Sequence, residues 1–82
     1  MKRTVDEKLR YNNERGGRFA TGYGLGVMLY RDYLKQDNDG KAIIKGIIDT
    51  NKSLAKEGNE MGKGFMCGIR DAANERKARQ RK

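Results

Sequence analysis

The residue types that carry most enzyme chemistry are sparse in this chain. It has no histidine, so the commonest general base and the commonest transition-metal ligand are both missing. The single cysteine, Cys67, lies between Met66 and Gly68 in an apolar stretch, which is typical of a small core residue. Asp37 to Gly40 starts like a calcium loop, but the closing Glu is absent. We therefore expect no catalytic residues, no metal site and no cofactor, and interpret the chain as a binding protein and not an enzyme.

The densest group of charged residues lies at the C-terminus. Residues 70–82 carry six basic and two acidic side chains. Alanines keep this segment slim and helix-prone, and a slim basic helix can contact phosphates and reach base edges in a groove. On a helix, the spacing places Arg70, Asn74, Lys77 and Arg81 on one stripe. The residues expected to bind nucleic acid or an acidic partner here are Arg70, Asn74, Arg76, Lys77, Arg79 and Arg81.

The positive charge of the chain gathers at its two ends. Nineteen Lys and Arg against eleven Asp and Glu leave a formal charge of +8. Residues 1–18 have six basic and three acidic groups, and residues 19–69 have seven and six, so the middle is almost neutral. Basic extensions on a neutral unit are suited to a polyanion, although charge also serves solubility. The second basic patch expected, at the N-terminal end, comprises Lys2, Arg3, Lys8, Arg10, Arg15 and Arg18.

Two functions fit this charge pattern. The first is a small basic helical binding protein, a nucleic-acid-binding accessory protein that acts on DNA or RNA through its C-terminal helix. The alternative is a protein-binding modulator or inhibitor, of the kind that mobile genetic elements encode, which docks on an acidic surface or nucleic-acid groove of another protein. The tyrosines bear on the choice, because exposed rings favour stacking on single strands or a protein hot spot. They are Tyr11, Tyr23, Tyr30 and Tyr33.

The cysteine content and the apolar runs indicate a cytoplasmic location. A lone cysteine cannot form an internal disulfide, so the fold does not need an oxidising compartment. The N-terminal residues do not lead into an apolar stretch of the length that a signal peptide needs. The most apolar run, residues 19–34, is interrupted by Arg31 and Asp32 and is too short to span a bilayer. We expect no membrane insertion.

Capping signals divide the chain into four helical segments. Thr4 followed by Glu7 is a possible capping box at the start of the first. A polar turn at residues 36–40 supplies Asn38 or Asp39 as the next N-cap. Gly58 can end the third segment in the left-handed conformation, and Asn59 can cap the fourth. The helices expected are residues 5–13, 18–35, 41–57 and 60–79.

The second segment has two competing interpretations. Phe19, Tyr23, Val27, Tyr30 and Leu34 step by four, four, three and four residues, which is one face of a helix. Residues 22–30 instead alternate and contain three glycines, which favours a strand. We favour the helix because its periodicity extends over sixteen residues.

Glycines spaced four apart predict where helices pack. Without side chains, such positions let another backbone approach closely. We therefore expect the second and fourth helices to cross at these stripes, within one chain or between two. On the third helix, Ile43, Ile47 and Leu54 lie on one line with Ile44 and Ile48 beside it. The helix-packing residues expected are Gly22, Gly26, Gly64 and Gly68.

The fold class predicted is all-α, a compact bundle of three or four helices with a thin core. Leu, Ile, Val and Phe number 5, 5, 2 and 2, which is 14 of 82 residues, so a second copy could complete the core as a homodimer. We expect residues 1–75 to form a single helical domain and residues 76–82 a basic C-terminal helical extension or tail.

Overall fold

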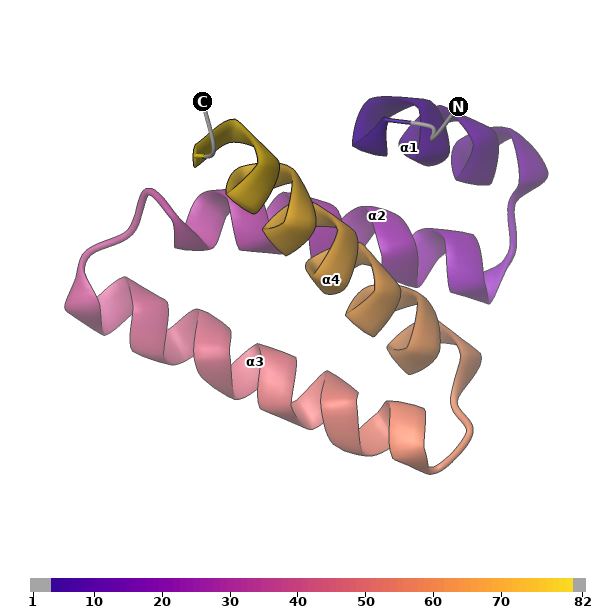
Figure 1. Cartoon of the computed structure of the whole chain (residues 1–82). Coiled ribbons are helices and arrows are strands. Elements are labelled where there is room, and N and C mark those ends of the chain that lie inside the picture. Colours follow the sequence, from indigo (N-terminus) through magenta and orange to yellow (C-terminus); the bar gives the residue numbers. More distant parts are fainter. Residues whose placement is uncertain (1–3, 81–82) are drawn as a thin grey trace.

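Helices make up most of the described chain, as the sequence predicted (Figure 1). The computed structural model describes residues 4–80 and the side chains of residues 4–78. The helices are α1 (Val5–Arg15), α2 (Arg18–Tyr33), α3 (Asn38–Lys56) and α4 (Glu60–Gln80). No strand occurs in residues 4–80, so the helical interpretation of the second segment is confirmed. Helix α4 continues unbroken across residue 76, where we expected a helical extension or tail to begin.

Side-chain caps begin three of the helices. The backbone amide of Glu7 donates to the Thr4 hydroxyl oxygen at 3.1 Å, and the amide of Gly62 donates to Oδ1 of Asn59 at 2.9 Å. Helix α3 starts earlier than expected, because the carboxylate of Asp37 accepts from the amide of Gly40 at 2.8 Å. The cap is thus Asp37 and not Asn38 or Asp39. Each cap satisfies an amide that the first turn of a helix leaves without a partner.

The crossing of α2 over α4 is the central contact of the fold (Figure 1). A Cβ atom added to Gly22 or Gly26 would overlap the backbone carbonyl of Met61 or Phe65. The two helices therefore run in the same direction along the contact. A Cβ atom added to Gly64 or Gly68 of α4 would likewise overlap a backbone carbonyl of α2, that of Phe19 or Tyr23. Backbones this close exclude any side chain larger than hydrogen at the four positions.

The apolar core is small and lies along this crossing. Val27 is fully buried, and Tyr23, Phe65 and Ala72 are nearly so. Val5 of α1 joins the same cluster, and Leu9, Tyr30 and Cys67 pack against it. The molecule measures 34 × 33 × 17 Å, so it is less than two helix diameters thick. A slab this thin leaves few side chains out of contact with water.

Helix α3 packs on α4 through its C-terminal half. Gly62 of α4 meets the backbone of Asn51 and Ala55, so a Cβ there would lie 2.8 Å from the Ala55 nitrogen. At the other end of α3, Ile44 is buried whereas Ile43 is 68% exposed and Ile47 is 41% exposed. The helix thus turns Ile44 inward and leaves Ile43 and Ile47 of the neighbouring line largely in solvent, while Leu54 of that line is half-buried beside Gly62.

Candidate functional site

The outer surface of the C-terminal half of α4 carries a line of exposed polar and basic residues. Arg70, Asn74 and Lys77 are all exposed. Their spacing of four and three residues puts them on one line, and this line lies on the opposite side of α4 from Gly64 and Gly68, which face α2. We refer to Arg70, Asn74 and Lys77 as the basic stripe.

Three other residues of this segment were predicted to bind a partner, and the structure describes the side chain of only one of them. Arg76 is exposed but lies on a different side of α4, beside the end of α2. Arg79 belongs to α4, with its side chain outside the described residues, and Arg81 lies outside them altogether. The structure therefore aligns three of the six residues and sets Arg76 apart.

The two carboxylates of this half of α4 turn inward. Asp71 accepts a hydrogen bond of 2.7 Å from the hydroxyl of Tyr23 and one of 3.2 Å from the ammonium of Lys8. Its side chain is only 11% exposed. Arg70 also approaches Asp71, at 3.6 Å, but its own side chain is 68% exposed and stays in solvent. Neutralisation of Asp71 from inside leaves the outer face of the helix dominated by positive charge.

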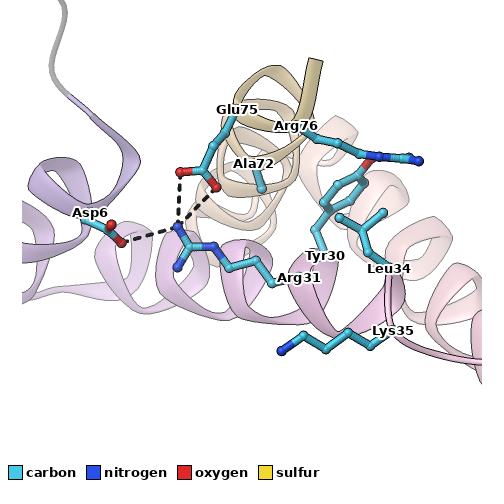
Figure 2. Close-up of a pocket in the computed structure, with 8 residues that line it drawn as sticks. All are labelled: Asp6, Tyr30, Arg31, Leu34, Lys35, Ala72, Glu75 and Arg76. Atoms are coloured by element: carbon cyan, nitrogen blue, oxygen red, sulfur yellow. Dashed lines mark hydrogen bonds and ion pairs between the residues drawn. The ribbon is translucent and has the colours of Figure 1, made fainter. Parts of the chain in front are cut away.

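Glu75 is held in the same way one turn later. The guanidinium of Arg31 lies 3.2 Å from Glu75 and 3.3 Å from Asp6, and it joins α1, α2 and α4 (Figure 2). Burial alone would lower the pKa of Arg31, but hydrogen bonds and charges from the two carboxylates outweigh it and raise the pKa above its ordinary value. Arg31 is therefore a structural cation that two carboxylates already neutralise.

Tyr23 and Asp71 form a hydrogen-bonded pair in which both pKa values are shifted. Burial and the hydrogen bond to Asp71 together raise the pKa of Tyr23 well above its ordinary value. Burial would raise the pKa of Asp71 too, but the hydrogen bonds from Tyr23 and Lys8 outweigh it and hold the pKa below the usual 3.8. Asp71 is thus an anion under ordinary conditions, and it anchors α1 and α2 to α4.

We expect this anchor to make the fold sensitive to acid. Because folding lowers the pKa of Asp71, its carboxylate contributes stability above pH 3.8, and this contribution is lost as the pH falls through the lower pKa of the folded state. Asp71→Asn should cost about 1.5–3 kcal/mol at neutral pH, the usual value of hydrogen bonds to a charged group. The measurement is urea denaturation of both proteins between about pH 7 and pH 2. The difference between them should shrink in acid, and a difference that is constant with pH would contradict the assignment.

Lys8, Arg15 and Arg18 of the N-terminal basic patch lie apart from the basic stripe, and Lys2 and Arg3 lie outside the described residues. Lys8 is half-buried in its ion pair with Asp71. Arg15 ends α1 and Arg18 begins α2, with the positive-φ glycines Gly16 and Gly17 between them. This link lies beside the first turns of α4, at the opposite end of the crossing from Lys77 (Figure 1). Arg15 and Arg18 are exposed there but do not extend the basic stripe.

The four tyrosines do not form one platform. Tyr23 is buried and belongs to the core, while Tyr11 is 48% exposed on α1. Tyr30 and Tyr33 stack on each other at the end of α2, with 5.9 Å between ring centroids and 28° between planes. The ammonium of Lys41 lies 5.6 Å from the centroid of Tyr33, within range of a cation–π contact.

A groove of about 390 Å³ opens beside this aromatic pair. Leu34 and Ala72 provide apolar surface, Arg76 lies beside the ring of Tyr30, and Lys35 lies farther from that ring, below Arg31 in the view (Figure 2). Sequence reasoning included Arg76 but missed the groove, because it forms only where the end of α2 meets α4. We refer to it as the terminal groove. Its lining residues are Asp6, Tyr30, Arg31, Leu34, Lys35, Ala72, Glu75 and Arg76.

Two further features bear on chemistry and on membranes. Among the side chains that the structure describes, no group of three or more His, Cys, Asp or Glu could hold a metal ion. Cys67 is half-buried against the core cluster, where it acts as a packing residue. Within residues 4–80, none of the helices has the length and apolar character needed to cross a bilayer.

Comparison with known protein families, curated proteins and solved structures gave no match. The case for a function therefore depends on the surfaces described above.

Proposed function

We propose that this protein binds nucleic acid as a small accessory protein, through the outer face of the C-terminal half of α4. The observation that supports this most is the separation of charge across the helix. Asp71 and Glu75 face inward onto Lys8 and Arg31, whereas the basic stripe faces solvent. Cations that face solvent attract a phosphate backbone and release its counterions.

Three further properties support the proposal. The net charge of +8 favours association with polyanions of either kind, DNA or RNA. Asn74, between two cations on the basic stripe, offers a hydrogen-bonding side chain that can reach a base edge or a sugar. A cytoplasmic location, which we propose from the single cysteine, would give the protein access to both polymers.

The test is a set of binding titrations against duplex and single-stranded DNA and RNA at two salt concentrations. The variant that carries both Arg70→Gln and Lys77→Gln should bind roughly tenfold more weakly or worse, with a salt slope lower by about two. Its matched control carries Lys45→Gln and Lys52→Gln, which remove the same charge from exposed positions of α3. Equal losses in both variants would show a general charge effect, and no binding at low salt to any of the four polymers would overturn the proposal.

A second candidate is a protein-binding modulator that docks on an acidic surface of its partner. The observation that favours it is a set of large apolar side chains in solvent on α2 and α3. Leu25 and Met28 are exposed on α2, and Ile43 and Ile47 on α3. Such side chains are typical of protein contacts, including contact with a second copy of the chain. A Leu25→Ser and Ile43→Ser protein that still binds nucleic acid normally but no longer self-associates would assign these residues to a protein contact.

A further inference from the structure

The terminal groove combines two kinds of surface that single-stranded nucleic acid uses. The ring of Tyr30 and the side chains of Leu34 and Ala72 are apolar, and Arg76 and Lys35 add positive charge to the lining. Arg31 also lines the groove, but Asp6 and Glu75 neutralise it. The acidic groups of the groove are therefore on the side of Arg31, as Figure 2 shows, and the cation beside Tyr30 is Arg76, with Lys35 farther away at the end of α2.

The size of the groove fits a single base. Its volume of about 390 Å³ lies in the range of sites that hold small molecules. A nucleobase could occupy the apolar surface, and a neighbouring phosphate would then lie near Arg76. The guanidinium of Arg76 can also stack on a base plane, which an ammonium cannot do.

We propose that the terminal groove takes up an unpaired base, so that the protein prefers single-stranded nucleic acid over duplex. This inference rests on the proposed function and specifies its substrate class. Arg76 and Lys77 are adjacent on α4, with Arg76 at the groove and Lys77 on the basic stripe. A strand could therefore pass from the basic stripe into the groove. Bases of a duplex are stacked and paired, and they cannot enter without costly flipping.

Substitutions at the adjacent residues Arg76 and Lys77 distinguish binding at the terminal groove from binding at the basic stripe. Arg76→Gln should lower the affinity for an oligothymidylate about fivefold or more while it changes duplex affinity less, because it removes a stacking contact as well as a charge. Lys77→Gln removes the same charge and should lower the affinity for both polymers alike. Leu34→Ser keeps the charge and alters a partly exposed side chain at the end of α2, so it should reduce only single-strand binding. Circular dichroism of each variant establishes that the helices are retained.

NMR spectroscopy can locate the bound base directly. In ¹H–¹⁵N NMR spectra, the oligothymidylate should shift the amides of Leu34, Lys35 and Ala72, and a duplex of equal length should leave them in place. Equal affinity for both polymers, with Arg76→Gln and Lys77→Gln indistinguishable, would overturn the inference and leave the proposed function intact. Absence of binding to either polymer at low salt would overturn both.

Discussion

Alanine at Gly26 or Gly68 is expected to destabilise this protein strongly, and alanine at Gly22 or Gly64 should have an effect of the same kind. A new Cβ at Gly26 or Gly68 would overlap a backbone carbonyl of the opposite helix, at Phe65 or Tyr23. A carbonyl oxygen cannot rotate away as a flexible side chain can, so α2 and α4 would have to separate. The cost should be about 1–3 kcal/mol per site, as for overpacking in other cores. Urea denaturation followed by circular dichroism measures it.

The thin core makes such a loss severe. Domains of this size have little stability to spare, and separation of α2 from α4 would also loosen Val27, the fully buried side chain of the core. The double variant Gly26→Ala, Gly68→Ala should therefore be largely unfolded at ordinary temperature. Leucine at either position should have a still larger effect than alanine.

The chain contains its own controls for this experiment. Gly24 of α2 and Gly46 of α3 are also helical, but a Cβ at either position has nothing within 4 Å. Alanine there should stabilise the protein by about 0.5–1 kcal/mol, because it removes only the conformational cost of a glycine within a helix. If Gly68→Ala were as harmless as Gly24→Ala, the close crossing of α2 and α4 would be refuted.

Deletion of residues 76–82 is expected to abolish most nucleic-acid binding without unfolding the protein. It removes five basic groups and no acidic one, so the formal charge falls from +8 to +3. The buried side chains of the described chain all precede residue 76, with Ala72 the last of them. The salt slope of binding should fall by up to about four if each of the five cations contacts a phosphate. Titrations of both proteins at two salt concentrations measure the change.

A full-length variant separates charge from helix length. Glutamine at the five basic positions of residues 76–82 keeps the segment and removes its charge. It should bind as weakly as the deletion if phosphate contacts dominate, and better than the deletion if the segment also contributes packing. Tight binding that ignores salt and survives both changes would instead assign binding to Tyr30, Tyr33 and the central helices.

Local sequence signals predicted the helices well because capping chemistry is local. Thr4 and Asn59 cap the helices that they were expected to cap, and Gly58 adopts a positive φ of 93° where α3 ends. The N-terminus of α3 was predicted less well. Asp37 and its neighbours offered several capping side chains in one turn, and sequence alone does not decide which of them is used.

Which face of a helix is buried was harder to predict. Ile43 and Ile44 lie on adjacent apolar lines of α3, and either line alone satisfies helical periodicity. Only the position of α4 against Asn51 and Ala55 selects the line of Ile44 for burial. The choice depends on contacts between residues far apart in the chain, which a local pattern does not contain.

What the sequence by itself determined is the all-α class, most of the helix boundaries, the glycine stripes and the excess of charge at the C-terminal end. Each of these depends on residues within one or two turns of each other. The tertiary structure alone decided that Asp71 and Glu75 face Lys8 and Arg31, and that Tyr30 and Arg76 meet in a groove. Those pairings join helices separated by more than forty residues, and they exist only because the glycines bring α2 and α4 into backbone contact.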